Sequence, residues 1–240
     1  MTDPYAPRDY WEQRLSASFN LRGVGHKSFS EWYNVWLYRR KARCLTRALD
    51  GARVEDASVL DVGCGTGFFV DQYLRRGARV RGIDITDVSI RRLREQYHGQ
   101  FETQDISAAG FVPAPAVDIV NMWDVMYHIV DPALYDLALT NISRSLKPGG
   151  LFLFTDWFGA PADQRIAAHV QGRCLATHSA RLGALGFTLD GLHPLYHLLN
   201  TRRLGSLDNI LAPLYYLLDN RATTISKDNL SLGVWRKRVA

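Results

Sequence analysis

Residues 59–68, Val-Leu-Asp-Val-Gly-Cys-Gly-Thr-Gly-Phe, constrain the fold of this chain more than any other stretch. The short apolar run at 59–62 has the composition of a buried strand, and it leads directly into three alternating glycines. The residues that follow, 67–76, have the pattern of a helix. A glycine-rich turn between a buried strand and a helix lets the backbone approach a ligand and offers it unpaired N–H groups. The stretch therefore predicts a ligand cradle in an α/β fold.

Strand and helix patterns alternate along the rest of the chain. Strands are expected at 59–62, 79–83, 101–103, 117–122, 151–155, 187–192 and 230–239, and helices at 30–49, 67–76, 88–97, 131–146, from beyond 161 to about 185, and at 204–218 with an interruption at Pro213. This order predicts a doubly wound, Rossmann-like α/β fold with a seven-stranded, mostly parallel sheet and helices on both faces. We expect residues 1–50 to form a helical lid and residues 51–240 the main domain, with a helical insert at about 201–226 before the last strand.

Composition excludes several other classes of protein. The 240 residues are 47% hydrophobic and 22% charged, as in soluble globular domains. No apolar run approaches the roughly 20 residues that span a bilayer, and the first residues lack a secretory pattern, so we expect a cytoplasmic protein without a membrane partner. Three widely spaced cysteines argue against a disulfide framework and against a zinc site, and we expect no bound metal.

The net charge of +5 is unevenly distributed. Residues 51–160 hold ten basic and fourteen acidic side chains, whereas residues 1–50 hold nine and five, and residues 161–240 hold ten and five. Basic flanks around an acidic middle are compatible with solvated surface charge, with an anionic small-molecule substrate or with a basic face for nucleic acid. Because the chain has no run of five or six like charges, nucleic acid is the disfavoured partner.

Acidic residues accompany the glycine-rich turn. Asp61 stands two residues before the first glycine, and Asp84 closes the second expected strand 23 residues later. An acidic side chain at that position is placed to accept hydrogen bonds from ribose hydroxyls. Phe68 occupies the position where a dinucleotide-binding turn has its third glycine, which disfavours an NAD-dependent dehydrogenase.

With these motifs, residues 55–160 resemble the class I S-adenosylmethionine-dependent methyltransferases, and in particular the small-molecule branch similar to methyltransferase types 11 and 12. Three further segments follow in the order of that family: Gln104-Asp105-Ile106 after the third strand, residues 117–129 around the fourth strand, and residues 146–154, which contain Pro148-Gly149-Gly150, before and within the fifth. The resemblance implies S-adenosylmethionine as the cofactor.

The resemblance also implies which residues bind this cofactor. Asp61 and the turn residues would shape its methionine end, Asp84 would bind the ribose, Asp105 the adenine amino group, and Trp123 would pack against the adenosyl group. Arg39 or Arg40 could reach the methionine carboxylate. The full set of expected cofactor-binding residues is Asp61, Gly63, Cys64, Gly65, Gly67, Asp84, Ile85, Asp105, Ile106, Trp123 and Arg39.

Three residues are candidates for catalysis. His128 follows the fourth strand and is the leading general base, since histidine titrates near neutrality, although a role in supporting the loop or the cofactor is equally compatible with its position. Asp156 ends the fifth strand and should border the substrate. His26 lies between a glycine and a polar run in the expected lid.

These observations favour methyl transfer to a small molecule, with a hydroxyl acceptor preferred because His128 can serve as its base. An RNA or protein methyltransferase is the alternative that the basic flanks suggest, and methylation of nitrogen or carbon in a small molecule is another. A cofactor-binding scaffold without activity is disfavoured by the presence of all three acids, Asp61, Asp84 and Asp105. The sequence leaves the substrate and the oligomeric state open.

Overall fold

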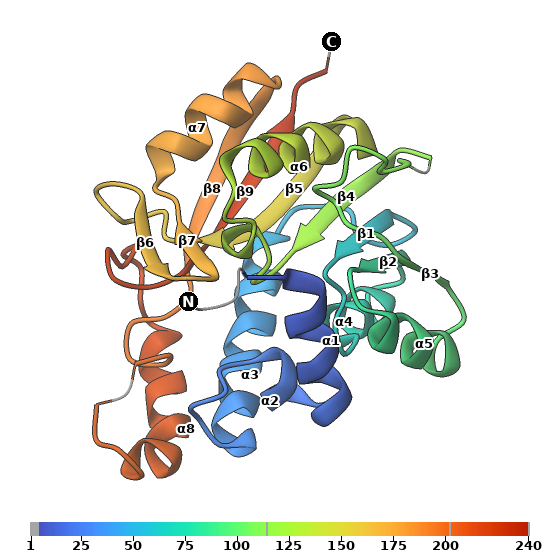
Figure 1. The fold of residues 1–240 in the computed structure, drawn as a ribbon. Helices are drawn as coiled ribbons and strands as arrows, with labels where there is room; N and C mark the ends of the chain where they lie inside the picture. Colours follow the sequence, from blue (N-terminus) through green and yellow to red (C-terminus); the bar gives the residue numbers. More distant parts are fainter. Residues whose placement is uncertain (1–4, 114, 202, 240) are drawn as a thin grey trace.

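One seven-stranded sheet organises the protein (Figure 1). The computed structural model describes residues 5–113, 115–201 and 203–239. The strands lie in the order β3-β2-β1-β4-β5-β9-β8. Neighbours from β3 to β5 are parallel, and β9 runs antiparallel to both β5 and β8, so the predicted fold class is confirmed. The strand bounds are β1 Ser58–Val62, β2 Arg79–Asp84, β3 Gln100–Thr103, β4 Val117–Met122, β5 Leu146–Asp156, β8 Phe187–Pro194 and β9 Ser231–Lys237.

The order of the strands reverses at β1, which lies between β2 and β4. From β1 the chain moves outward to β2 and β3 and then returns to the other side of β1 as β4. In open parallel sheets, ligands bind outside the carboxyl ends of the strands at such a switch point. The topology therefore places the glycine-rich turn, which follows β1, at the edge of the sheet where a ligand is expected.

Helices cover both faces of the sheet and create two cores. On one face, α3 (Glu31–Ala48), α4 (Phe68–Leu74) and α5 (Asp87–Gln96) contribute Leu37, Tyr73 and Leu93 to a single buried cluster. On the other, α6 (Pro132–Ser145) and α7 (Leu175–Ala184) contribute Ile142 and Leu182 to a second cluster. Helix α3 lies within residues 1–50, yet it shares a core with β1 of the main domain. The predicted boundary between a lid and a main domain at residue 50 stays a prediction.

Local capping explains where two of these helices begin. The Ser30 hydroxyl accepts a hydrogen bond from the Tyr33 N–H at 3.1 Å and starts α3. Asp131 accepts from Ala133 N–H and Leu134 N–H at 2.8 and 3.0 Å and starts α6 one residue before Pro132. These are the N-cap residues that the sequence indicates.

The helix expected from beyond Pro161 to about Leu185 is wrong in its first half. Residues there form a small antiparallel hairpin, β6 (Gln164–Ala167) and β7 (Val170–Gly172), and α7 begins only at Leu175. Asp163 fixes that start, because its Oδ1 accepts the Cys174 N–H at 2.8 Å. The two strands are only four and three residues long, too short to show a period of two.

Pro213 does not interrupt the helix in which it lies. The helix α8 runs without a break over Leu207–Asp219, and Ala212 and Tyr215 from it are buried in the same cluster as α3. We attribute its continuity to this packing, which compensates for the hydrogen bond that proline cannot donate. None of the helices that the structure describes is both long enough and apolar enough to cross a membrane.

The N-terminal helices lie against the carboxyl edge of the sheet (Figure 1). Helix α1 (Pro7–Ala17) is attached to the first turn of α5, where the Glu12 carboxylate accepts hydrogen bonds from Asp87 N–H at 2.8 Å and Val88 N–H at 3.2 Å. Arg8 forms an ion pair with Asp87 at 2.6 Å. The short helix α2 (Leu21–Val24) connects α1 to α3. This arrangement fixes α1 beside the turn that follows β1.

Candidate active site

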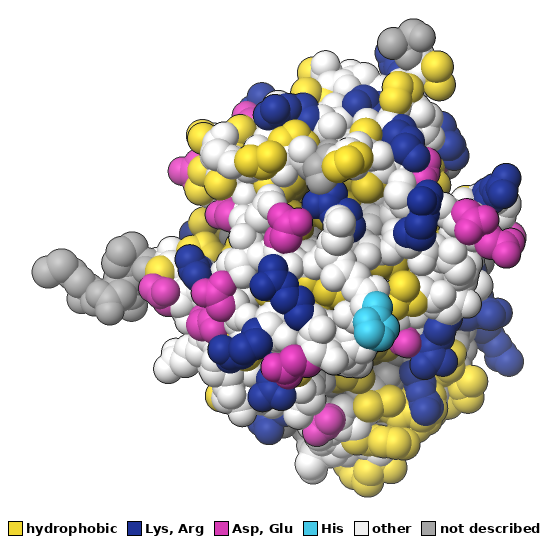
Figure 2. All heavy atoms as spheres, turned by 90° about the vertical axis from the view of Figure 1, so that its right-hand side faces the viewer, with side chains coloured by type: hydrophobic (Ala, Val, Ile, Leu, Met, Phe, Trp, Pro, Cys, Tyr) yellow, Lys and Arg dark blue, Asp and Glu magenta, His cyan; other side chains and the backbone are white. Residues whose placement is uncertain are grey.

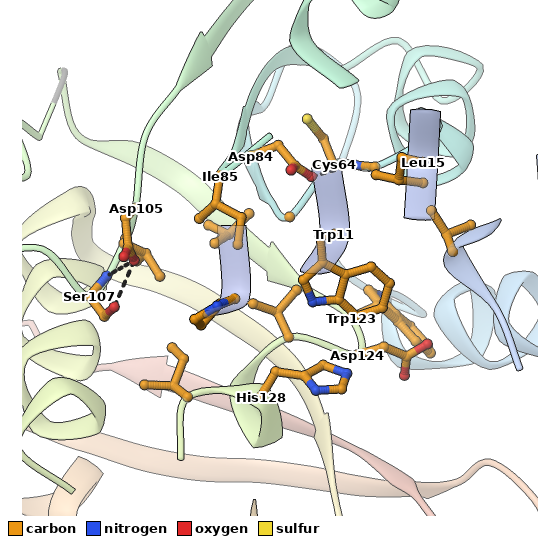
Figure 3. A pocket seen from close by; sticks show the side chains of 18 of the residues that line it. Trp11, Leu15, Cys64, Asp84, Ile85, Asp105, Ser107, Trp123, Asp124 and His128 are labelled. Atoms are coloured by element: carbon orange, nitrogen blue, oxygen red, sulfur yellow. Dashed lines mark hydrogen bonds between the residues drawn. The ribbon is translucent and has the colours of Figure 1, made fainter. Parts of the chain in front are cut away.

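A cavity of about 360 Å³ lies at the switch point of the sheet. Its walls come from the glycine-rich turn after β1, the segments after β2, β3 and β4, and the N-terminal helices (Figure 3). Nine of the predicted site residues line the cavity: Gly63, Cys64, Gly65, Asp84, Ile85, Asp105, Ile106, Trp123 and His128. Asp124, which is not among the predicted site residues, lines it too. The cavity volume falls in the range of small-molecule sites.

The glycine-rich turn has a backbone that only glycine adopts without strain. Gly63 and Gly65 have φ values of +70° and +52°. The N–H groups of Gly63 and Cys64 donate to the Ile83 carbonyl at 2.8 and 3.1 Å, which ties the turn to β2. A Cβ atom on Gly63 would lie 2.3 Å from Cγ2 of Val125, so no side chain fits there. Gly67, with φ +82°, is the N-cap of α4 and does not line the cavity.

Two carboxylates after neighbouring strands line the cavity. Asp84 is buried, and its oxygens accept from Gly65 N–H at 2.9 Å and from the N–H and hydroxyl of Thr86 at 2.9 and 2.7 Å. These bonds use three of the roughly four acceptor positions of a carboxylate and leave one for a ligand. Oδ1 of Asp105 accepts from the N–H and hydroxyl of Ser107 at 2.8 and 2.6 Å, as Figure 3 shows.

Asp61, expected to bind the cofactor, does not reach the cavity. It is 2% exposed and lies beneath the turn, where its Oδ1 accepts from the Asn121 amide at 2.7 Å. Burial raises the pKa of Asp61 to about 7, against the lowering effect of the Asn121 hydrogen bond. Asp61 therefore lies under the turn, where its hydrogen bond with Asn121 joins β1 to β4. Asp61 can affect a bound ligand only through the backbone of the turn.

Apolar and aromatic side chains form the remaining walls. The Trp123 ring is stacked on Phe69 with centroids 4.6 Å apart, and its indole N–H donates to Asn121 Oδ1 at 2.7 Å. Ile85 and Ile106 line the cavity beside the two carboxylates. Burial raises the pKa of the Cys64 thiol well above its usual value, so this cysteine stays protonated and acts as a small apolar side chain.

His128 lies on the cavity wall in the short helix η1 (Met126–His128). Its Nδ1 is 2.8 Å from the backbone carbonyl oxygen of His169, in the turn between β6 and β7. Because a carbonyl can only accept, Nδ1 carries the proton and Nε2 carries the lone pair in the neutral ring. Burial lowers the pKa of His128 to about 4, so the ring is neutral at physiological pH.

A buried ion pair stands next to this histidine. The Lys41 ammonium, on a side chain 4% exposed, contacts Oδ2 of Asp124, whose side chain is 19% exposed and lines the cavity. Burial acts to lower the pKa of Lys41, but the attraction of Asp124 outweighs it, and the pKa is raised above its ordinary value. Asp124 has a φ of +57°, and its N–H donates to the Thr155 hydroxyl at 2.8 Å.

The N-terminal segment covers the cavity. Tyr5, Pro7, Trp11 and Leu15 line it from α1 and the residues before it, and Val24 lines it from α2. The Trp11 ring packs edge-on against His128 with centroids 5.2 Å apart. The cavity is therefore partly covered by the segment that the sequence predicts to be a lid.

Three predicted site residues lie away from the cavity. Asp156 is fully buried on the other face of the sheet, where its carboxylate accepts from the N–H groups of Trp157 and Arg173 and bonds the His178 ring of α7 at 3.0 Å. His26 is exposed, and its ring packs on Phe29 at 4.8 Å.

Arg39 is the third. Its guanidinium lies over the Trp36 ring at 4.3 Å on the outside of α3. Arg40, the alternative, is buried but donates to the Pro194 carbonyl at 2.5 Å. The structure thus corrects the expectation that either arginine reaches the cavity, and it places the next residue, Lys41, on the inner side of α3.

A comparison with protein families identifies the family of this chain. Residues 33–186, more than half of the chain, match the model of a family described as "Methyltransferase domain". The chain belongs to the class I S-adenosylmethionine-dependent methyltransferases.

Curated relatives are similar over the same core. The ubiquinone biosynthesis O-methyltransferase of Alkalilimnicola ehrlichii is 31% identical over 122 residues, which are 48% of this chain and 44% of that protein. That of Idiomarina loihiensis is 35% identical over 141 residues, 56% of this chain and 52% of that protein. The chain thus spans about half the length of the curated relatives it matches.

Solved structures share the fold at low sequence identity. The magnesium protoporphyrin IX methyltransferase of Synechocystis, solved with S-adenosylmethionine bound, aligns over 96% of this chain and 94% of that one with a TM-score of 0.65 and 15% identity. At this identity the likeness shows the fold alone.

The residues of this methyltransferase fit the cofactor of its family. S-adenosylmethionine combines hydrogen-bond donors on its adenine and ribose with positive charge on its sulfonium and ammonium. The cavity offers two carboxylates, Asp84 and Asp105, between apolar walls, and a turn whose glycines keep side chains out of the way. The donors and charges of the cofactor therefore have counterparts in the residues present.

Several cavity residues were missed by sequence reasoning. Tyr38 lines the cavity, and Lys41, three residues later on the same side of α3, pairs with Asp124 on the cavity wall, a spacing that could have separated Lys41 from the arginines before it. The positive φ of Asp124 and the carbonyl of His169 have no signal in the sequence. Trp11 and Leu15, four residues apart on α1, could have been found as one face of the lid helix.

Proposed function

We propose that this methyltransferase transfers a methyl group to a hydroxyl oxygen of a small molecule. The observation that carries the proposal is the tautomer of His128, which presents an unprotonated Nε2 in a ring on the cavity wall. A hydroxyl acceptor has to lose a proton during methyl transfer, and a neutral imidazole at this position can accept it.

We assign the cofactor-binding roles from the positions of the two carboxylates in the cavity. Asp84, with one acceptor position left, would hold the ribose, and the exposed Asp105 would bind the adenine amino group. Trp123, fixed by Phe69 and Asn121, would pack against the adenosyl group. When bound, S-adenosylmethionine supplies a methyl group made electrophilic by its sulfonium.

The low pKa of His128 is compatible with its role as a base. A hydroxyl becomes far more acidic as its oxygen forms a new bond to carbon, so a base with a pKa of about 4 can take the proton late in the step. The His169 carbonyl holds the ring in the tautomer that this requires. The apolar wall around it, including Trp11, would limit the access of water to Nε2 and favour proton transfer from the acceptor.

The acceptor that we favour is an aromatic hydroxyl. Trp11, Phe69 and Trp123 line the cavity, and the Trp11 ring lies 5.2 Å from that of His128. Aromatic walls of this kind suit a planar ring. The names of the curated relatives, O-methyltransferases of ubiquinone biosynthesis, agree with such an acceptor. A cavity of about 360 Å³, partly covered by the N-terminal segment, favours a small acceptor over RNA or protein.

The test is a methylation assay on a panel of phenols, alcohols and amines, read by mass spectrometry. We expect methylation of phenols, with kcat lowered roughly 10²–10⁴-fold in His128→Gln and the affinity for S-adenosylhomocysteine nearly unchanged. His98→Gln, at an exposed histidine outside the cavity wall, is the matched control and should leave kcat unchanged. Methylation of amines alone, or a His128→Gln enzyme with more than half of the normal kcat, would refute the proposal.

A further inference from the structure

The outer face of α8 is apolar and uncovered in the part of the chain that the structure describes. Leu207, Ile210, Leu214 and Leu217 recur at intervals of three and four residues and form one stripe along the helix. Their side chains are between 49% and 73% exposed. Leu204 and Leu218 extend the stripe at 55% and 43%. Five large apolar side chains on one helix, with Leu204 just before it, are more than the scattered exposure that is normal for a soluble surface.

Helix α3 extends this surface with aromatic rings. Trp32 is 52% exposed and packs edge-on against Trp36, whose ring lies 5.3 Å from Tyr216 of α8. We call the stripe on α8 together with Trp32 the apolar face. In Figure 1, α8 lies at the lower end of the molecule, and in Figure 2 hydrophobic side chains gather at that end with Lys and Arg side chains beside them.

The acids of α8 are turned away from the apolar face. Asp208 is buried and accepts hydrogen bonds from the N–H groups of Arg203 and Leu204 and from the Tyr215 hydroxyl. Asp219 is buried too, and it accepts the N–H groups of residues 197–199. Both carboxylates are thus engaged in the fold, and the outer side of the helix carries no charge.

The exposed charges around the apolar face are mainly basic. Among the described residues from 203 to 228, four charged side chains are exposed. Three are basic, Arg203, Arg221 and Lys227, and one is acidic, Asp228. Arg39 and Arg47 of α3 lie on the same side, since Arg39 stacks on Trp36 and Arg47 donates to the Asn220 carbonyl at the end of α8 at 2.7 Å. Glu31, next to Trp32 in the chain, is an exposed acid on the same helix, so the uncharged stripe lies within a rim that is mainly, but not wholly, cationic.

We propose that the apolar face docks on the surface of an anionic phospholipid bilayer. An apolar helix face with an aromatic side chain and basic residues around it is the pattern of helices that lie in the membrane interface. The rim would meet the negative headgroups, and the leucines and Ile210 would enter the acyl boundary. A second copy of the chain is a poorer occupant, because a symmetric contact would bring the two cationic rims together. The composition of the chain alone predicts no membrane partner.

Vesicle flotation tests the proposal with the full chain. We expect binding to vesicles of phosphatidylcholine with 30% phosphatidylglycerol, weaker binding to phosphatidylcholine alone, and loss of the difference at high salt. Ile210→Glu/Leu217→Glu should weaken binding at least tenfold, and Arg203→Gln/Arg221→Gln should reduce only the part that depends on anionic lipid. Val112→Glu, at a residue 70% exposed elsewhere, is the matched control and should bind normally. All five substituted positions are exposed, so we expect these variants to fold.

A second readout locates the contact. Lipids brominated near the headgroup should quench tryptophan fluorescence in the wild type, and Trp32→Phe should remove most of that quenching. Absence of wild-type binding to anionic vesicles, or equal binding by Ile210→Glu/Leu217→Glu, would overturn the proposal. So would a dimer in light scattering that this double variant abolishes, since the occupant would then be a second copy.

Discussion

Replacing Asp124 with asparagine would leave the Lys41 ammonium without its counter-charge in a buried site. Asparagine is the appropriate change because it tolerates the φ of +57° at this position. Removing one partner of a buried ion pair costs about 3–5 kcal/mol, because the remaining charge stays desolvated. Since the Lys41 side chain is only 4% exposed, we expect Asp124→Asn to fall within that range.

The reverse change should cost less. In Lys41→Met the remaining charge is on Asp124, which is 19% exposed and keeps its hydrogen bond from the Thr155 hydroxyl at 3.1 Å. We therefore expect a loss of about 1–3 kcal/mol. Lys147→Met is the control, because the Lys147–Asp118 pair at 2.8 Å is about 40% exposed on both sides and should contribute no more than ~1 kcal/mol.

The assay is urea unfolding followed by circular dichroism, with m-values compared to confirm a two-state transition. In Asp124→Asn, burial without a counter-charge would lower the pKa of Lys41. The unfolded chain would then bind more protons than the folded one in the alkaline range, so the variant should regain stability as the pH rises toward 10. A loss below 1 kcal/mol in Asp124→Asn, or one no larger than in Lys147→Met, would refute the reasoning.

Three further predictions concern other contacts of the site. The pKa of His128 lies near 4 instead of about 6.5, so the free energy of unfolding should rise by up to ~3 kcal/mol between pH 4 and 6.5, and urea unfolding of His128→Gln should lack this slope. Glu12→Ala removes the carboxylate that joins α1 to α5. We expect faster proteolysis of the N-terminal segment and severalfold weaker binding of S-adenosylhomocysteine by calorimetry, whereas the control Glu31→Ala should bind normally. Gly63→Ala introduces a Cβ in a position with φ +70° and should cost about 1–3 kcal/mol and most of the cofactor affinity, whereas Gly110→Ala, with open space around it, should be nearly neutral in both measurements.

The sequence by itself determines the strand, turn and helix around the glycines and the positions of Asp84 and Asp105 after their strands. These signals are local, since apolar period and turn chemistry depend on neighbours in the chain. The alternation of elements then implies a parallel sheet, and a parallel sheet brings the carboxyl ends of its strands to one edge. The fold class and the predicted residues that line the cavity after the parallel strands therefore follow without coordinates.

Contacts between distant segments are decided only by the tertiary structure. The hairpin formed by β6 and β7 consists of strands too short to show a period, yet its turn supplies the His169 carbonyl that selects the tautomer of His128, 41 residues earlier. Asp156 ends a strand beside the site, but its side chain lies on the face that α7 covers, and there it bonds His178. Neither partner can be identified from the chain near His128 or Asp156.

The basic run Arg39-Arg40-Lys41 shows the same limit within a single helix. Successive side chains on a helix point about 100° apart, so three neighbouring cations face three different environments. Arg39 stacks on Trp36 outside, Arg40 donates to the Pro194 carbonyl, and Lys41 pairs with Asp124 at the cavity. The sequence predicts that a cation of α3 lies near the site. The packing of the apolar side chains of α3 sets the rotation of this helix against the sheet, and that rotation decides which of the three cations approaches the cavity.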